Sequence, residues 1–182
     1  MYRVNEIFRS LQGEGYHTGT PAVFVRLSGC NLHCNFCDTR HETFTLMTAA
    51  DIATAVRHYD TPLIVLTGGE PSLQLDTTLI NALRALHRTL CIETNGIRPL
   101  PDGIDWVTCS PKANSTLALD KADEVKIVYT GQDVEAMRRS INAPHYFLQP
   151  CSNRNTQQTV DYILAHPHWR LSLQTHTLIH IP

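Results

Sequence analysis

The chain has 182 residues, of which 42% are hydrophobic and 18% are charged, and these proportions are typical of a globular protein with a well-filled core. Domains usually hold roughly 100–200 residues, so we expect residues 1–182 to form a single domain. A formal net charge of −2 excludes a general electrostatic attraction to nucleic acid or to an anionic membrane, and no apolar run approaches the roughly 20 residues needed to span a bilayer.

The first segment, Met1–Phe8, alternates polar and apolar residues. A secretory signal would instead place a charged start before a continuous apolar run, so we expect a strand here and a protein that stays in the cytoplasm. Thiols are kept reduced in that compartment. The six cysteines are therefore expected to include metal ligands rather than to form three disulfides.

The rest of the chain alternates short apolar runs with segments of helical spacing, separated by Gly and Pro at turns. Thr48 is followed three residues later by Asp51, a capping-box pattern that predicts the start of a helix. The expected strands are Arg3–Arg9, Pro21–Leu27, Leu63–Leu66, Leu90–Thr94, Trp106–Cys109, Glu124–Tyr129, His145–Leu148 and Trp169–Leu173. The expected helices are Thr48–His58, Asp76–His87, Asp133–Ile141 and Thr156–Ala165.

Alternating strands and helices predict an α/β fold with right-handed parallel crossovers and a buried sheet. Of these strands, about six or seven are expected to belong to that sheet, fewer than the eight of a closed barrel, so we expect an incomplete TIM-like barrel of parallel strands with outer helices. In such folds ligands gather at the carboxyl ends of the strands. The polar or glycine-rich segments that follow expected strands are Cys30–Cys37, Thr67–Pro71, Glu93–Gly96, Cys109–Lys112 and Gln149–Pro150.

Three thiols, Cys30, Cys34 and Cys37, lie within eight residues of one another. A structural zinc site normally needs four protein ligands, so zinc would require an outside ligand, for which the candidates are His33, Asp38 and Cys151. A cubane iron–sulfur cluster held by three thiolates instead leaves one iron open to a small molecule. The three thiols therefore indicate a metal site. The absence of a fourth cysteine ligand in the loop favours a catalytic site over a structural one.

The remaining cysteines, Cys91, Cys109 and Cys151, are expected to be packed and inert, as single thiols in apolar strands usually are. The ten histidines show no paired metal-ligand spacing, so none is assigned a role. Taken alone, the paired glycines of Thr67–Pro71 and the polar residues at the other strand ends are better explained as simple turns.

The spacing Cys30-x3-Cys34-x2-Cys37 in a loop after a strand resembles the signature of the radical S-adenosylmethionine (SAM) superfamily. The resemblance implies a 4Fe-4S cluster whose open iron chelates the amino and carboxylate groups of SAM, which one electron then cleaves to a 5′-deoxyadenosyl radical. It also implies that Phe36 packs against the adenine and that the glycine loop meets the methionine amino group. The SAM contacts that it implies are Phe36, Cys37, Asp38, Gly69, Ser110, Pro111, Lys112 and Gln149.

Three further segments, Leu11–Gly15, Val25–Leu32 and Cys37–Thr39, resemble the 7-carboxy-7-deazaguanine synthase family, and the resemblance continues to Pro182. It implies a carbon–nitrogen lyase that contracts the ring of 6-carboxy-5,6,7,8-tetrahydropterin to give 7-carboxy-7-deazaguanine and ammonia, in the biosynthesis of 7-deazapurines such as queuosine. The substrate contacts that it implies are Leu11, Gln12, Gly13, Arg26, Thr67 and Pro182.

Within that resemblance, Arg26 would pair with the substrate carboxylate, since guanidinium is a bidentate match for carboxylate. Thr39 would ligate Mg²⁺, which favours hard oxygen ligands and keeps several waters. The radical would abstract hydrogen from carbon 6 of the substrate and regain it at the end, while the protein positions the reactants and excludes water.

Two alternatives remain at this stage. One is a radical SAM activating enzyme whose partner is a protein, as in the glycyl-radical activating enzymes, and the other is a non-catalytic zinc-binding module. Whichever holds, an incomplete barrel leaves a sheet edge to be covered, so a homodimer is expected. Radical SAM chemistry further requires an external one-electron reductant such as flavodoxin or ferredoxin.

Overall fold

The computed structural model describes residues 1–37, 39 and 42–182. Its strands are β1 (Tyr2–Leu11), β2 (Pro21–Leu27), β3 (Thr45–Met47), β4 (Leu63–Gly68), β5 (Thr89–Thr94), β6 (Trp106–Cys109), β7 (Glu124–Tyr129), β8 (His145–Pro150) and β9 (Arg170–Leu171). Its helices are α1 (Ala49–Arg57), α2 (Thr77–Arg84), α3 (Val134–Arg139), α4 (Thr156–Ala165) and α5 (Thr175–Leu178), with 3₁₀ turns at Pro71–Leu73 and Cys151–Asn153. The sequence predicted neither β3 nor α5. Within the described ranges, no helix is long and apolar enough to cross a membrane.

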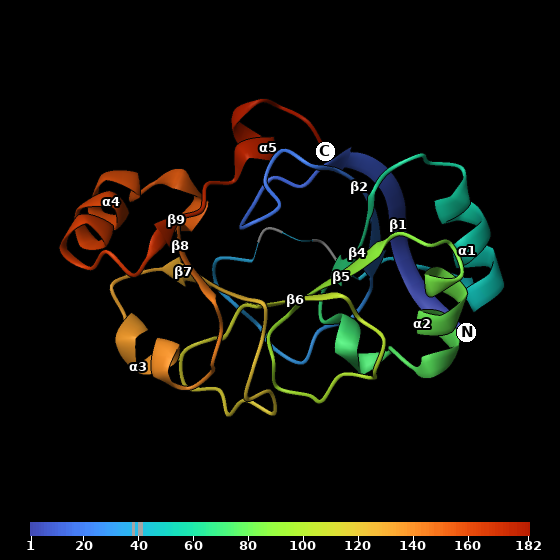
Figure 1. Ribbon diagram of the computed structural model, residues 1–182, viewed down its shortest axis with the longest axis horizontal. Helices are drawn as coiled ribbons and strands as arrows, with labels where there is room; N and C mark the ends of the chain where they lie inside the picture. Colours follow the sequence, from blue (N-terminus) through green and yellow to red (C-terminus); the bar gives the residue numbers. More distant parts are fainter. Residues whose placement is uncertain (38, 40–41) are drawn as a thin grey trace.

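The strands form one curved sheet in the order β3-β1-β2-β4-β5-β6-β7-β8-β9. Every pairing from β2 to β9 is parallel, and α1, α2, α3 and α4 each lie in one of the crossovers that such pairing needs. In Figure 1, α1 and α2 lie beside one end of the sheet and α3 and α4 beside the other. Because β3 and β9 are separate edges, the barrel is incomplete, which confirms the expected fold class.

Two details of the sheet differ from the prediction. The described residues contribute nine strands rather than six or seven, and β1 runs antiparallel to both β2 and β3. Residues 12–20 join β1 to β2 as a hairpin loop, so no crossover helix is needed there.

Helices bury the outer face of the sheet. Thr48 Oγ1 accepts a hydrogen bond from the Asp51 N–H at 3.1 Å, and the Thr48 N–H donates to Asp51 Oδ2 at 2.9 Å, which confirms the predicted capping box. Ile52 and Val56 of α1 and Leu83 of α2 are fully buried in the same cluster as the outward side chains of β2, β4 and β5. Burying each such side chain contributes about 1.5–3 kcal/mol, so this packing holds that half of the sheet in place.

The inner face of the sheet changes from apolar to polar along the strands. Successive strand residues point to opposite faces, so Phe24, Val65 and Cys91 share one face of three paired strands, where they form an apolar cluster with Phe8 and Trp106. The next residues on that face, two positions later, are polar: Arg26, Thr67, Glu93 and Thr108. These polar groups lie near the carboxyl ends of their strands, where the expected site would be.

The loop between β1 and β2 packs into the barrel rather than over its rim. The Gly15 N–H donates to Ser172 Oγ at 2.9 Å, and the Tyr16 N–H donates to Glu124 Oε2 at 2.7 Å. Gly15 has a φ of +67°, and a Cβ built there would lie 2.2 Å from Glu124 Oε1. Glycine is therefore required at this position by both the backbone conformation and the close approach.

Replacing Gly15 with Ala should destabilise the protein more than replacing Gly19, which lies in the same loop. Gly19 also has a positive φ, +86°, but nothing lies within 4 Å of a Cβ built there. Gly19→Ala should therefore carry the backbone cost alone, about 1–2 kcal/mol. Overpacking against Glu124 adds about 1–3 kcal/mol for Gly15→Ala. Melting temperatures measured without oxygen would compare the two variants, and equal shifts would show that the Glu124 contact does not constrain the loop.

Candidate active site

Two adjoining cavities lie at the carboxyl ends of the parallel strands. The first has a volume of about 200 Å³ and the second about 530 Å³. Both are lined by the same four residues, which we call the shared wall: Glu14, Thr39, Thr67 and Glu93. Ligands in the two cavities would thus be separated by a few side chains.

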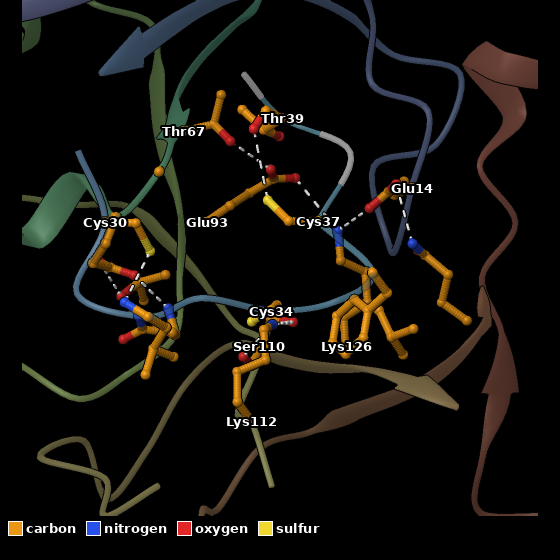
Figure 2. A pocket seen from close by; sticks show the side chains of 18 of the residues that line it. Glu14, Cys30, Cys34, Cys37, Thr39, Thr67, Glu93, Ser110, Lys112 and Lys126 are labelled. Atoms are coloured by element: carbon orange, nitrogen blue, oxygen red, sulfur yellow. Dashed lines mark hydrogen bonds and ion pairs between the residues drawn. The ribbon is translucent and has the colours of Figure 1, made fainter. Parts of the chain in front are cut away.

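The clustered thiols Cys30, Cys34 and Cys37 line the first cavity (Figure 2). The Leu32 N–H donates to Cys30 Sγ at 3.4 Å, and the Cys37 N–H donates to the Cys34 carbonyl at 3.0 Å, so the loop folds back on itself. All three are free thiols. Three thiols on one cavity, with no fourth cysteine in their loop, fit a 4Fe-4S cluster that leaves one iron for another ligand.

The glycine loop after β4 packs directly on the start of the cysteine loop. The Gly69 N–H donates to the Leu27 carbonyl at 3.0 Å, and the Glu70 N–H donates to the Gly29 carbonyl at 2.9 Å. A Cβ built at Gly69 would lie 2.1 Å from the Gly29 oxygen, so the two backbones meet here only because the residue is glycine. Gly69 itself lines the first cavity, as the predicted SAM contact requires.

Glu70 fixes the glycine loop to the end of β5. Its carboxylate is buried and accepts hydrogen bonds from the Ser72 N–H at 3.0 Å, from Thr94 Oγ1 at 2.7 Å and from the Asn95 N–H at 2.7 Å. A carboxylate with this many donors is held in one orientation. The loop is thereby a rigid part of the cavity wall.

The other predicted SAM contacts fall on the first cavity with two exceptions. Phe36, Ser110, Lys112 and Gln149 line it, together with Cys37 and Gly69. Lys112 Nζ donates to the Ser110 carbonyl at 2.8 Å and to Ser110 Oγ at 2.7 Å, and burial lowers the pKa of Lys112. Pro111 is buried and does not line either cavity. Asp38 lies outside the described residues.

All six predicted substrate contacts line the second cavity: Leu11, Gln12, Gly13, Arg26, Thr67 and Pro182. Arg26 Nε donates to Glu6 Oε1 at 2.7 Å, and its Nη1 donates to Thr39 Oγ1 at 3.4 Å. Ser10 Oγ donates to the Pro182 carbonyl at 2.6 Å, which ties the end of the chain to β1. The structure therefore brings this set together, while the role of each residue stays a prediction.

His176 was not expected from the sequence and lines the second cavity. The N–H of Thr175, the first residue of α5, donates to the Gly13 carbonyl at 3.0 Å, and a Cβ built at Gly13 would lie 2.2 Å from His176 Nδ1. Gly13 thus leaves room for the imidazole. No sequence pattern predicted this contact, because the histidines show no regular spacing and because Gly13 and His176 lie near opposite ends of the chain.

Lys126 also lines a cavity, and the sequence did not single it out. Its side chain is 7% exposed, and its Nζ donates to Glu14 Oε2 and to Glu93 Oε1, the latter at 3.5 Å (Figure 2). A signal was present, because a lysine inside the apolar strand β7, two residues after Glu124 and on the same face, is unusual for a sheet covered on both faces.

The three cysteines outside the cluster behave differently from one another. Cys91 and Cys109 are buried as expected, and burial raises the pKa of each to about 12. Cys151 was also expected to be packed, but it is partly exposed and lines the first cavity, so that expectation was wrong. It follows the end of β8, where the chain leaves the sheet and side chains face the cavity.

Comparison with known proteins agrees with this geometry. Residues 24–142 match the radical SAM superfamily. The chain is 59% identical to a 7-carboxy-7-deazaguanine synthase of Bacteroides thetaiotaomicron, with 100% of this chain and 99% of that protein covered, and 45% identical to one of Neisseria meningitidis serogroup B, with 96% and 92% covered. The crystal structure of QueE from Escherichia coli superposes with a TM-score of 0.80 at 31% identity, covering 96% of this chain and 94% of that one. The chain therefore belongs to the 7-carboxy-7-deazaguanine synthase family of radical SAM enzymes.

Proposed function

We propose that this protein converts 6-carboxy-5,6,7,8-tetrahydropterin to 7-carboxy-7-deazaguanine and ammonia, as a carbon–nitrogen lyase in the synthesis of 7-deazapurines such as queuosine. The observation that carries the proposal is the pair of cavities with a shared wall, one lined by three thiols and the other by Arg26 and Pro182. A radical formed in the first cavity would meet a carboxylated substrate in the second across a few side chains.

The first cavity supplies what a 4Fe-4S cluster and SAM need. The cluster would be held by Cys30, Cys34 and Cys37, which all face the cavity. When bound, the cluster and SAM supply the radical that removes a hydrogen atom from the substrate. The protein's own part is to hold SAM still: Phe36 offers an aromatic face, and Ser110 offers a hydroxyl group that faces the same space.

The second cavity would hold the pterin and its carboxylate. Arg26 lines it with a charged guanidinium that suits a carboxylate, and Gln12 contributes an amide that suits a ring edge with both donors and acceptors. Leu11 and Gly13 lie beside Gln12, Thr67 adds a hydroxyl group from β4, and Pro182 closes the cavity at the end of the chain. Together they would fix the ring relative to the first cavity.

A magnesium ion is proposed beside Thr39. Thr39 Oγ1 lies 3.4 Å from Arg26 Nη1 in the shared wall, so a cation there and the guanidinium could both meet one substrate carboxylate. Mg²⁺ is usually held by one or two protein oxygens together with substrate oxygens and water, which suits a site with a single hydroxyl ligand.

The assembly and setting of the enzyme are also proposals. We propose that residues 1–182 act as one domain in the cytoplasm, and that two copies form a homodimer because β3 and β9 leave open sheet edges, with Leu46 and Leu171 exposed on them. Cys37 is exposed, which suits electron delivery from an external one-electron donor such as flavodoxin or ferredoxin. Neither nucleic acid nor a membrane is proposed as a partner.

Of the two alternatives, membership of the radical SAM superfamily removes the non-catalytic zinc-binding module. A radical SAM enzyme that activates a protein would need an open route for a polypeptide. Here the second cavity is bordered by the β1–β2 loop and by the end of the chain, which Ser10 binds. The volume of this cavity, about 530 Å³, is in the range typical of small-molecule sites.

Reduced protein incubated without oxygen with carboxytetrahydropterin, SAM and Mg²⁺ should release 7-carboxy-7-deazaguanine, identified by mass spectrometry. Cys34→Ala should lose both the product and the broad visible absorption of the cluster, because one of the three ligands is gone. Cleavage of SAM by the wild-type protein without formation of the deazaguanine would contradict the proposed substrate.

Arg26→Ala should raise the KM for carboxytetrahydropterin by about 10- to 100-fold, since a hydrogen bond to a charged group contributes about 1.5–3 kcal/mol. The absorption of the cluster should not change. Arg9→Ala is the matched control, because Arg9 is an exposed arginine of β1 that lines neither cavity. An unchanged KM in the Arg26 variant would remove Arg26 from the substrate site.

Thr39→Ala should raise the Mg²⁺ concentration needed for half-maximal rate by about 10-fold or more, the range seen when groups that support a metal site are lost. Thr39→Ser keeps the hydroxyl group and should restore the wild-type requirement. If Thr39→Ala and the wild-type protein respond identically to Mg²⁺ titration, Thr39 is not a ligand.

A further inference from the structure

The two carboxylates of the shared wall are joined through one ammonium group. Lys126 lies on β7, Glu93 on β5 and Glu14 on the loop between β1 and β2, so three separate parts of the chain meet at this point. Figure 2 shows Lys126 reaching both carboxylates. The side chains of Glu14 and Glu93 are 14% and 26% exposed, so Glu93 is the more open of the two to the cavities.

Each oxygen of Glu93 is positioned by a donor. Oε1 accepts from Gln12 Nε2 at 3.2 Å as well as from Lys126, and Oε2 accepts from Thr67 Oγ1 at 2.9 Å. Gln12 and Thr67 line the second cavity, whereas Lys126 lines only the first. Lys126 therefore holds Glu93 from the side opposite to the proposed substrate.

Glu14 is held in the same network. Its Oε1 accepts from Gln149 Nε2 at 3.2 Å, and its N–H donates to Gln12 Oε1 at 3.1 Å. The bonds thus close a ring that runs through Gln12, Glu93, Lys126 and Glu14. A change at any member would shift the carboxylates that face the cavities.

The opposite charges of Lys126 and of the carboxylates Glu14 and Glu93 keep one another ionised. Burial alone would lower the pKa of Lys126, but the surrounding carboxylates, Glu14 above all, outweigh burial and hold that pKa above its ordinary value. Burial alone would raise the pKa of Glu93, but the charge of Lys126 and the hydrogen bonds from Thr67 and Gln12 hold it below its ordinary value. Glu93 is therefore an anion that can accept a hydrogen bond from an N–H group in the second cavity.

We propose that Lys126 is a positioning residue for the substrate: from the first cavity it fixes the Glu93 carboxylate in the shared wall, so that Glu93 accepts a hydrogen bond from an N–H group of the bound ring. The proposal rests on the proposed function, because a reduced pterin supplies such N–H donors. Lys126 itself touches no substrate atom. Its effect should appear in substrate binding and not in the cluster.

The test compares Lys126→Met with Lys126→Arg. Lys126→Met keeps an unbranched stem of similar length and removes the ammonium group, so it should raise the KM for carboxytetrahydropterin, and the dissociation constant measured by calorimetry, by about 10-fold or more. The KM for SAM and the absorption of the cluster should change by less than about 3-fold on the same reasoning. Lys126→Arg keeps a cation and should recover most of the lost affinity.

Lys126→Met leaves two carboxylates without a cation and can therefore fail to fold. The double variant Lys126→Met with Glu14→Gln removes one cation and one anion, which restores the net charge of the group. If Lys126 only neutralises charge during folding, the double variant should bind substrate as the wild-type protein does. We expect it to fold with a native melting temperature and to keep the raised substrate KM.

Glu135→Gln is the control, since it removes a partly buried, hydrogen-bonded charge at a residue of α3 that lines neither cavity. It should alter the melting temperature without raising the substrate KM. A wild-type protein that forms no deazaguanine would overturn the proposed function and this inference with it. A wild-type protein that forms product, with an unchanged substrate KM in Lys126→Met or a larger change in the KM for SAM, would overturn this inference alone.

Discussion

The alternation of side chains along parallel strands is the constraint on which the site depends. Phe24, Val65 and Cys91 pack together on the inner face near the start of β2, β4 and β5, and this packing sets the register of the strands. A shift of one residue would turn an apolar side chain toward the cavities and a polar one toward the helices. The inner apolar cluster therefore holds Thr67 and Glu93 in place from two residues away, and its Phe8 and Phe24 also line the second cavity.

Glycine contacts set the shape of the loops in the same way that packing sets the strands. At Gly68 and Gly69 a Cβ would lie 2.1 Å from a backbone oxygen of the cysteine loop or of β2, and at Gly13 it would lie 2.2 Å from the ring of His176. Loops that pack backbone against backbone, or backbone against a ring, have little freedom to move. The parts of the cavity walls at Gly13, Gly68 and Gly69 are thus rigid even though they are built from irregular chain or lie at the end of a strand.

Much of the fold could be predicted because its signals are local. The capping box at Thr48 and the apolar runs at Trp106–Cys109 and Glu124–Tyr129 depend on neighbouring residues alone, and the last two match the observed strands residue for residue. The motifs at the strand ends could likewise be placed at one edge of the sheet, since parallel strands all end there. The predicted contacts with SAM, with the substrate and with Mg²⁺ needed the family resemblance as well.

The parts that could not be predicted depend on distant contacts. β3 has three residues and exists through its pairing with β1, while α5 has four residues and begins at the bond between Thr175 and the Gly13 carbonyl. Segments this short have no stability of their own. Lys126 is separated from Glu14 by 112 positions, and nothing near either residue in the sequence points to the other.

The buried charges of Glu14, Glu93 and Lys126 do little for stability. Removing an ion from water costs several kcal/mol, and replacing a buried ion group with well-packed apolar residues is often neutral or stabilising by about 1–4 kcal/mol. The outer core around α1 and α2 already supplies extensive apolar burial without these ions. Their place in the wall between two cavities fits a different requirement, which is to fix charged acceptors at defined positions before any ligand arrives. Rigid strands, rigid loops and a closed ring of hydrogen bonds all serve that requirement, because a reaction that passes a radical from one ligand to another depends on how accurately both are held.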